Sequence, residues 1–547
     1  MSKETPVVGL DVILEQLGPF GKYNIVNYAL LLVPVYLAGM YGSVFVFEAS
    51  DVDYRCEISA CETILNDSII WTQYAIPQGK KGLSKCSQYS YRDGIVLDNN
   101  TICSTELFNT SRTETCSSFV YGDQDSAVID VSIQRCQDGK RTLIGTFHNA
   151  GLFLSLPLTG FVSDRFGRKV ALSIASLMNC IFGFLRSFSV NYYMMVAFEF
   201  LEAGFGAGAY STAFVLAMEL VGPKGRVLGN TLINVVFVFG LMSLSGLSWI
   251  LQDWRTLLRI IYAPACLVFS YLWILNESVR WLLSKGRNDE AIAILERAAK
   301  MNDVMLAPHD LAPLQDTEKP DNAELTGPKE AIQENKPSVI MQVIRSSIIR
   351  KRLVVCSFLW ITCTFVYYGL SINSVSLAGN KYINFMLVAF IEIPANLACL
   401  VVLDRYGRKK VMIITYFLSA ILCISLSFLP KGHPWWSLII YLSGKFSITT
   451  AYSSVYIYVS EVFPTNVRQS LLAICSSTGR IGSTLAPLTP LLALYYDNLP
   501  SIFFGTLAIM AGLLVFTLPE TINVPLPDTI EEAEMLSRGK KQSVDQP

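Results

Sequence analysis

The sequence predicts an all-α membrane protein with twelve transmembrane helices in two pseudo-symmetric halves of six. Of its 547 residues, 52% are hydrophobic and only 16% are charged, and the mean hydropathy is +0.41. Soluble domains carry about 25% charged residues, so this chain has too few charges to cover a surface exposed to water. Long apolar stretches recur along it, and two motifs repeat at nearly one offset. These observations indicate a duplicated helical bundle in a bilayer.

Each predicted span is about as long as the stretch of ~20 mostly apolar residues that crosses a membrane as a helix, or longer. The spans lie near 24–47, 141–163, 170–189, 192–218, 228–250, 256–275, 353–374, 381–403, 411–429, 434–460, 469–496 and 501–518. The first stretch is too long for the apolar region of a signal peptide, and no cleavage site of small residues follows it. The expected regions are an N-terminal segment (1–23), the first helix (24–47), an outer domain (48–140), helices two to six (141–275), a loop (276–352), helices seven to twelve (353–518) and a tail (519–547).

Alternate short connections between the spans are rich in Arg and Lys. The positive-inside rule makes those connections cytoplasmic, which places both termini in the cytoplasm and 48–140 outside a plasma membrane. The outer segment has an even number of cysteines and three Asn-x-Ser/Thr sequons, as expected for a disulfide-bonded, glycosylated loop. The cysteines are Cys56, Cys61, Cys86, Cys103, Cys116 and Cys136, and the sequons begin at Asn66, Asn99 and Asn109. Six cysteines allow fifteen connectivities, and the loop can serve stability and trafficking without touching substrate.

Two motifs are duplicated. DRFGRK at 164–169 returns as DRYGRK at 404–409, and ELVGPKGR at 219–226 corresponds to EVFPTNVR at 461–468. Carboxylates, guanidinium groups and a Gly turn at a helix end can form ion pairs that hold one face of a transporter closed. Cytoplasmic anchors joined by a turn are the alternative. The gating candidates are Asp164, Arg165, Gly167, Arg168, Glu219, Arg226, Glu277, Arg280, Asp404, Arg405, Gly407, Arg408, Glu461 and Arg468.

These motifs, with NESVRWL at 276–282 and PET at 519–521, resemble the major facilitator superfamily. The six-cysteine loop, MELVG at 218–222 and YVSEVFPT at 458–465 narrow the resemblance to solute carrier family 22. It covers nearly the whole chain and implies the major facilitator fold and alternating-access transport of organic cations, anions or zwitterions. That family usually has Pro where Asn276 and Val279 stand here, which bears on turn geometry.

Ionisable residues inside a span are costly and therefore point to function. Arg480 lies among small residues, and a substrate carboxylate could form a bidentate pair with it; the alternative is a pair with a protein carboxylate. In the resembling family the position is Asp in many cation carriers and Arg in anion and carnitine-type carriers. Glu392, before Pro394, could balance an amine or exchange a proton, or be held in a helix contact. One Arg and one Glu in a shared polar chamber suit a zwitterion.

Other residues complete the expected substrate site. Lys445 faces the cavity by family resemblance, with pairing to a Glu as the alternative, and the family's anion carriers often have Lys where Asn396 stands. Glu199 and Glu202 are expected to pair within the protein, and Arg259 to reach the outer interface. Mid-span tyrosines can supply cation–π attraction, although simple packing is the alternative for most. They are Tyr36, Tyr210, Tyr367, Tyr368 and Tyr452.

Several functions are excluded by what the sequence lacks. There is no phosphate-binding Gly-x-x-x-x-Gly-Lys motif, no Gly-x-Ser-x-Gly elbow and no metal-ligand spacing among the three histidines. A net charge of −1 gives no footprint for nucleic acid. We therefore expect no enzyme, metal or cofactor. The expected partners are a small organic ion and membrane lipid, with H⁺ or Na⁺ coupling left open, and a transporter-like receptor or scaffold is the rival interpretation.

Overall fold

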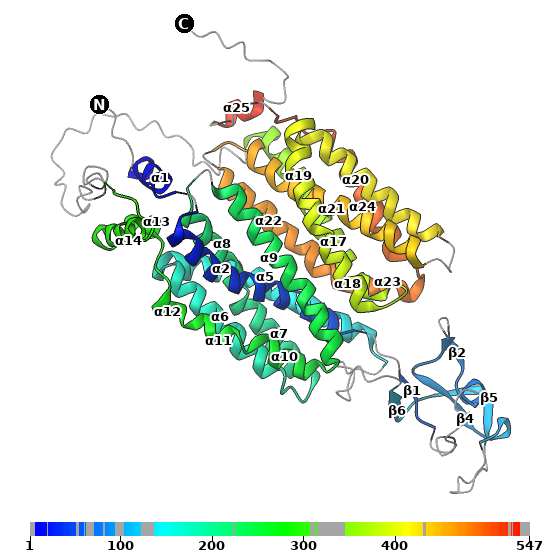
Figure 1. Ribbon diagram of the computed structural model, residues 1–547. Coiled ribbons are helices and arrows are strands. Elements are labelled where there is room, and N and C mark those ends of the chain that lie inside the picture. The colour runs from blue at the N-terminus through cyan, green and yellow to red at the C-terminus, as the bar shows by residue number, and fades with distance from the viewer. Residues whose placement is uncertain are drawn as a thin grey trace.

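The computed structural model describes residues 6–18, 20–50, 54–58, 61, 71–79, 82–92, 103–121, 136–222, 225–306, 311, 314, 345–429, 434–465, 467–522, 524, 527 and 529–535. Two groups of long helices lie side by side, and a small domain of β-strands projects from one end of the bundle (Figure 1). The N-terminal half, blue to green, occupies one side of the bundle, and the C-terminal half, yellow to red, occupies the other. The duplication in the sequence therefore corresponds to two halves in space.

The N-terminal half contains three predicted spans that are each divided into shorter helices. The helices are α2 (Lys22–Tyr41), α3 (Val44–Glu48), α5 (Asp138–Phe166), α6 (Arg168–Arg186), α7 (Tyr192–Gly206), α8 (Gly208–Leu220), α9 (Arg226–Leu251), α10 (Trp254–Tyr262), α11 (Ala265–Phe269) and α12 (Tyr271–Ile274). The break between α10 and α11 falls at Pro264, which has no N–H to continue the helical ladder. The predicted spans 24–47, 192–218 and 256–275 are thus helical but discontinuous.

The C-terminal half repeats this arrangement. Its elements are α17 (Ser347–Asn373), η4 (Ser374–Ser376), α18 (Lys381–Phe390), α19 (Glu392–Tyr406), α20 (Arg408–Ser425), η5 (Leu426–Phe428), α21 (Pro434–Val462), α22 (Arg468–Leu485), η6 (Ala486–Leu488), α23 (Thr489–Tyr495) and α24 (Leu499–Val515). Pro394 cannot donate to the carbonyl of Phe390, and the predicted span 381–403 is interrupted at Ile391. Glu392 therefore begins a helix in the middle of a span.

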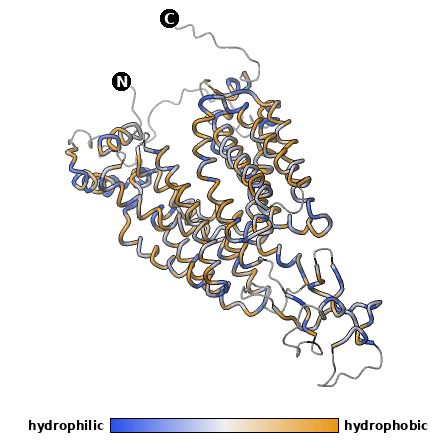
Figure 2. The backbone as a smooth tube through the Cα atoms, turned by 45° about the vertical axis from the view of Figure 1, so that its right-hand side comes forward, coloured by the Kyte–Doolittle hydropathy of each residue, from blue (hydrophilic) through white to orange (hydrophobic). Residues whose placement is uncertain are grey.

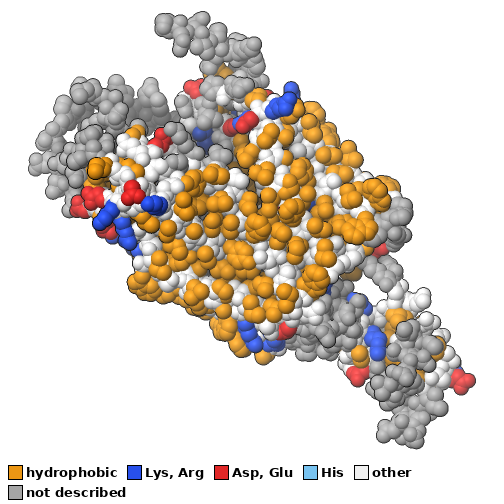
Figure 3. Space-filling view, in the orientation of Figure 1, with side chains coloured by type: hydrophobic (Ala, Val, Ile, Leu, Met, Phe, Trp, Pro, Cys, Tyr) orange, Lys and Arg blue, Asp and Glu red, His pale blue; other side chains and the backbone are white. Residues whose placement is uncertain are grey.

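The surface of the bundle is apolar over a broad band. Within the described residues, eight helices are long and apolar enough to cross a membrane. The other four predicted spans are also helical, as α5, α21, α22 with α23, and α24, but α24 has only 17 residues and α22 is rich in Ser, Thr and Gly. Hydrophobic residues predominate along the helices (Figure 2). In space-filling view they cover the visible face of the bundle, and charged groups gather toward its two ends (Figure 3), as a bilayer requires.

The two halves pack against each other at the end of the bundle that bears the β-strands. Ser245 of α9 donates a hydrogen bond of 2.7 Å to the carbonyl of Tyr382 in α18. The ring of Phe47 stacks on Tyr382 and meets Phe385 edge to face. Because Tyr382 and Phe385 belong to the hydrophobic core of the N-terminal half, α18 joins the halves at this end.

The segment between α3 and α5 forms a small disulfide domain of three two-stranded antiparallel ribbons. Its elements are β1 (Tyr54–Cys56) with β6 (Phe119–Tyr121), β2 (Gln78–Gly79) with β3 (Gly82–Leu83), β4 (Ser87–Tyr91) with β5 (Phe108–Thr115), α4 (Thr72–Ala75) and η1 (Thr105–Leu107). The disulfides are Cys56–Cys116, Cys61–Cys103 and Cys86–Cys136, which selects one of the fifteen connectivities. Asn109 is exposed on β5, whereas Asn66 and Asn99 lie outside the described residues.

Short helices lie at the opposite end of the bundle, as α1 (Pro6–Gln16), α13 (Val279–Ser284), α14 (Asn288–Met301) and α25 (Ile530–Met535). The turn after α14 is fastened to the start of α2. Asn302 accepts a hydrogen bond from the backbone N–H of Tyr23 and donates one to the carbonyl of Leu17. The Lys22 ammonium, 2.8 Å from Asp303, lowers the pKa of that carboxyl through a charge-assisted hydrogen bond.

Candidate functional site

The turn between α5 and α6 is built around a half-buried carboxylate, that of Glu277. Gly167 has φ of 105°, a left-handed conformation that favours glycine, and a Cβ there would overlap the side chain of Glu277. The Glu277 carboxylate accepts backbone N–H bonds from Arg168 (2.9 Å) and Lys169 (3.2 Å). These groups are the free donors at the start of α6, where the helix dipole also favours an anion. The glycine is therefore needed both for the turn and for the approach of Glu277.

The turn between α19 and α20 has the same construction. Gly407 has φ of 89°, and a Cβ there would overlap Glu520. The Glu520 carboxylate accepts N–H bonds from Arg408 (3.0 Å) and Lys409 (3.2 Å). Glu520 was not among the gating candidates, although a signal was present, since it lies 243 residues after Glu277, close to the offset of the other duplicated motifs.

The guanidinium groups of the two motifs tie three helices together in each half. Arg168 lies 3.0 Å from Asp164 and 3.5 Å from Glu219 of α8. Arg408 lies 3.4 Å from Asp404 and 2.9 Å from Glu461 of α21, and Thr521 donates to Glu461 over 2.7 Å. Each of these networks joins helices of one half rather than one half to the other. A gating role would therefore act through the orientation of helices within a half.

The remaining gating candidates lie around these networks. Arg165 and Arg405 are exposed, and their guanidinium groups lie over neighbouring aromatic rings, of Phe161 and Phe166 and of Tyr406. Arg468 at the start of α22 donates to the carbonyl of Phe463. Arg226 begins α9, and Arg280 lies in α13. Arg165 and Arg405, the first arginines of the two motifs, thus lie outside the ion pairs that Arg168 and Arg408 form.

Two candidates for the substrate site bind each other. The Lys445 ammonium lies 2.9 Å from the Glu392 carboxylate, and both side chains are buried. Lys445 also donates to Ser371 Oγ (2.7 Å) and to the carbonyl of Tyr367 (3.2 Å), and it lies 3.2 Å from the centre of the Tyr367 ring. The broken span places Glu392 at the start of α19, facing this ammonium. The carboxylate is therefore already balanced before any amine arrives.

The candidate tyrosines extend from this ion pair toward Arg480. Tyr367 stacks on Tyr452 with ring centres 5.7 Å apart and meets Tyr368 edge to face at 5.1 Å. Tyr452 is within electrostatic reach of Arg480, of Tyr368 and of Tyr210 from the N-terminal half. Within the described chain, Arg480 has no protein carboxylate in ion-pair range. The fold thus places an unpaired guanidinium beside a tyrosine cluster formed by both halves.

Two candidates lie apart from this group. Tyr36 packs against the core of the N-terminal half, where its carbonyl abuts Gly240 of α9 at a close helix crossing. Asn396 accepts a hydrogen bond of 2.8 Å from Ser453 of α21. A small cavity of about 20 Å³ lies elsewhere, at the disulfide-domain end, between Phe47, Trp254 and Tyr382. We give it no role in the site because it is remote from Arg480 in the fold.

Comparisons with known proteins agree with this architecture. Residues 101–532 match the sugar (and other) transporter family. The organic cation transporter protein of Drosophila melanogaster is 31% identical over 98% of this chain and 96% of its own length. Bovine solute carrier family 22 member 1 is 31% identical (97% and 94%), as is mouse organic cation/carnitine transporter 2 (95% and 93%). The chain belongs to the major facilitator superfamily and, within it, to solute carrier family 22.

Solved structures of this superfamily share the fold. The partially occluded inward open structure of the xylose transporter XylE from E. coli has a TM-score of 0.57 at 17% identity, covering 91% of this chain and 99% of XylE. The inward open structure has a TM-score of 0.55 at 18% identity, covering 75% and 92%. The family 22 chain is thus a multi-pass membrane transporter and not an enzyme, as predicted.

Other charged residues of the transporter lie within its helices and pair with one another. Glu199 and Glu202 pair within the protein, as expected, but their partners are Arg186 and His148. The three side chains His148, Glu199 and Glu202 form a group in which atoms able to bind a metal lie within 4.8 Å of one another. Arg259 donates to Ser187 Oγ and lies over the ring of Phe188. Arg186, the last residue of α6, was not among the candidates, although its position inside the predicted span 170–189 was a signal.

Proposed function

We propose that this transporter carries small organic zwitterions, with a carboxylate and an ammonium group, across the plasma membrane by alternating access, with both termini in the cytoplasm. The observation that carries the proposal is the guanidinium of Arg480, which lies beside Tyr452 and has no carboxylate in ion-pair range in the described part of the chain. A planar guanidinium binds a carboxylate through two parallel hydrogen bonds. The faces of Tyr367, Tyr368 and Tyr452 offer cation–π attraction of about 0.5–2 kcal/mol each to an ammonium group.

The names of the relatives are compatible with this class of substrate. The fly and mouse relatives are named for organic cations and for carnitine, and carnitine carries both an ammonium and a carboxylate. A substrate that is only cationic would leave Arg480 without an anion and would meet its positive charge. We therefore rank zwitterions before simple cations.

A second candidate substrate class is the organic anion. The Glu392–Lys445 pair is balanced, so the candidate substrate residues carry one net positive charge, that of Arg480. If substrate does not separate the pair, an ammonium group has only tyrosine faces to bind. The choice between the two classes then depends on how much those faces contribute.

Uptake into liposomes containing the purified protein tests the proposal. Three labelled compounds of matched size are compared: a trimethylammonium carboxylate, a carboxylate without the amine and a quaternary amine without the carboxylate. We expect saturable uptake of the first, and preference for the second would instead establish the anion class. Runs with and without Na⁺ and at two pH values identify a coupling ion. Absence of uptake of all three at either pH would overturn the proposal.

Substitution of Arg480 separates transport from the receptor or scaffold alternative. Arg480→Ala should abolish uptake of carboxylated compounds while surface expression stays intact, and Arg480→Asp should shift preference toward the quaternary amine. Arg287, which is exposed and paired with Glu290 on the short helices, provides the control Arg287→Gln, which should transport normally. Unchanged relative uptake in Arg480→Asp would remove Arg480 from the site.

A further inference from the structure

Five ionisable side chains meet inside the N-terminal half, apart from the proposed substrate site. We call them the buried acid cluster: Glu48 of α3, His148 of α5, Arg186 of α6, and Glu199 and Glu202 of α7. Each is at most 2% exposed. Because Glu48 ends α3 and Arg186 ends α6, the cluster lies toward the disulfide-domain end of the half.

The contacts in the cluster centre on one guanidinium. Arg186 contacts Glu199 and lies 3.3 Å from Glu48 and 3.7 Å from Glu202. His148 Nδ1 lies 2.7 Å from Glu199 and 3.9 Å from Glu202. Glu199 is thus bound closely from two sides, whereas Glu202 lies at longer range from both cations and Glu48 pairs with Arg186 alone among the described residues.

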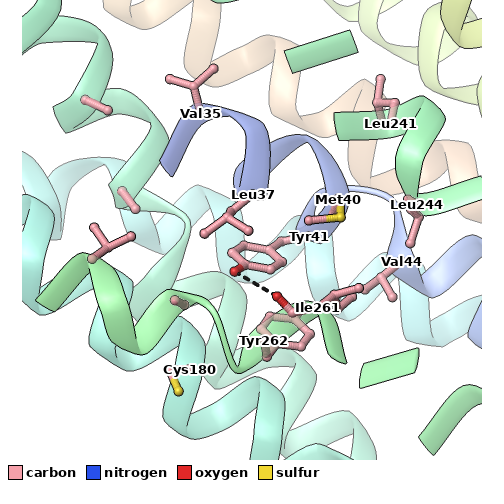
Figure 4. Packing of buried hydrophobic residues seen from close by; sticks show 14 of the residues in the cluster. Val35, Leu37, Met40, Tyr41, Val44, Cys180, Leu241, Leu244, Ile261 and Tyr262 are labelled. Atoms are coloured by element: carbon pink, nitrogen blue, oxygen red, sulfur yellow. Dashed lines mark hydrogen bonds between the residues drawn. The ribbon is translucent and has the colours of Figure 1, made fainter. Parts of the chain in front are cut away.

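Among the described residues, the other polar groups around the cluster add no full positive charge. Arg186 donates to the Tyr262 hydroxyl over 3.0 Å, and Tyr262 stacks on Tyr41, whose own hydroxyl donates to the carbonyl of Ile261 (Figure 4). Cys180 of α6 and Cys266 of α11 lie near Tyr41. The nearby cations, Arg255 and Arg259 of α10, hydrogen-bond to Ser187 and Ser189 instead.

The cluster is short of positive charge. Three carboxylates face one guanidinium and one imidazole, so ionisation of all five groups leaves one net negative charge, and a neutral His148 leaves two. Both oxygens of Glu48, Oε2 of Glu202 and Nε2 of His148 are buried and have no hydrogen-bond partner among the residues that the structure describes. An uncompensated buried charge is strongly destabilising, so a further positive charge is required.

We propose that the buried acid cluster is a proton-binding site, in which His148 is protonated and a second proton resides on Glu202 or Glu48. Two added protons bring the five groups to neutrality. A protonated carboxyl also becomes a hydrogen-bond donor, which an ionised one is not. Glu199, bound by both cations, stays ionised.

A proton fits the geometry better than a metal ion. The space between Glu199 and Glu202 already receives Nη1 of Arg186. A metal ion held by His148, Glu199 and Glu202 would have this guanidinium as its neighbour, and the two positive charges would repel in a medium of low dielectric. A proton avoids this because it is carried on an oxygen or nitrogen atom of the cluster itself.

The site lies next to a contact between the two halves. The ring of Phe45 packs on the His148 ring at 5.2 Å. Phe45 and, from the C-terminal half, Pro487 both pack against Gly145 of α5, where an added Cβ would overlap them. Only the side chain of Phe45 therefore lies between His148 and this contact between the halves.

Infrared spectroscopy of the full-length purified protein tests the proposal without any substrate, so its outcome is independent of the proposed transport function. We expect the C=O band of a protonated, buried carboxyl at neutral pH, lost in either Glu202→Gln or Glu48→Gln. The matched control is Glu392→Gln, which removes a buried carboxylate that Lys445 already balances, so the band should remain. Absence of the band from the wild type, or its persistence in both cluster variants, would overturn the proposal.

Thermal unfolding provides a second readout. Gln resembles a protonated Glu, so substitution at the protonated position should shift the unfolding temperature less than Glu199→Gln, which removes an ionised partner of Arg186. Stability of the wild type should fall as the pH is raised far enough to remove the second proton, and the tolerated Gln variant should lack that fall. Loss of the infrared band on adding Na⁺ or Zn²⁺, with a raised unfolding temperature, would establish a metal site instead.

Discussion

Lys445 and Glu392 form an ion pair of 2.9 Å across the centre of the C-terminal half, and neither side chain is more than 6% exposed. Removal of one member leaves the other charge buried and uncompensated. We expect Lys445→Met to destabilise the protein by about 3–5 kcal/mol, measured by thermal unfolding in detergent. The double variant Glu392→Gln/Lys445→Met should recover much of that loss, because no lone charge remains. Equal loss in the single and double variants would contradict a coupled pair.

The glycine turns should not tolerate a methyl group. Gly167→Ala holds an alanine at φ of 105° and ψ of 158°, a conformation that costs on the order of 1–3 kcal/mol for residues other than glycine, and it drives the new methyl into Glu277. Gly407→Ala does the same against Glu520. The matched control is Gly160→Ala in α5, where a Cβ would meet nothing within 4 Å and no left-handed conformation is needed. Unfolding temperatures should fall in the first two variants and stay constant or rise in the third.

The two arginines of each duplicated motif should differ in importance. Arg408→Ala removes the ion pair with Glu461 and should cost about 1.5–3 kcal/mol, the range for hydrogen bonds to charged groups. Arg405→Ala removes only an exposed guanidinium over Tyr406 and should change the unfolding free energy little. Equal effects of the two substitutions would show that the network around Arg408 contributes nothing beyond surface charge.

The disulfide pairing predicts which cysteine becomes a free thiol when its partner is replaced. Cys61→Ser should expose a single new reactive thiol, that of Cys103, and the double variant Cys61→Ser/Cys103→Ser should expose none. Loss of one native disulfide from a small domain costs typically 2–5 kcal/mol. Maleimide labelling followed by peptide mapping identifies the reactive thiols in the single and the double variant. Cys266→Ser, at an exposed free cysteine, is the control. Labelling of any cysteine of the domain other than Cys103 would reject the pairing.

Acid should loosen the attachment of α14 to α2. The pKa of Asp303 is lowered by Lys22, so the contribution of this pair is fully present above the ordinary aspartate pKa and is lost as the pH falls through the lowered value. Both side chains are exposed, and salt should weaken the effect. Hydrogen exchange of α14 should accelerate at low pH in the wild type, whereas Asp303→Asn should exchange at the accelerated rate at neutral pH as well.

The positions of the helices and of the duplicated turns follow from the sequence, because they depend on local properties. Apolar length predicts a spanning helix wherever it occurs, and the spacing of Gly167 and Gly407 marks the same turn in both halves. The breaks at Pro264 and before Pro394 are local as well, since proline lacks an N–H. The even number of cysteines in the segment 48–140 likewise predicted that they form disulfides.

Only the tertiary structure decided which groups meet. Glu392 and Lys445, Arg186 and Glu48, and the partners of the six cysteines are distant along the chain, and a charge in a helix does not reveal what neutralises it. The sequence left Glu392 free to bind a substrate amine or to pair within the protein, and the packing of α19 against α21 brings Lys445 into an ion pair with it. Arg480 has no such partner among the described residues. Pairing depends on how the helices pack, which the pattern of any single helix does not determine.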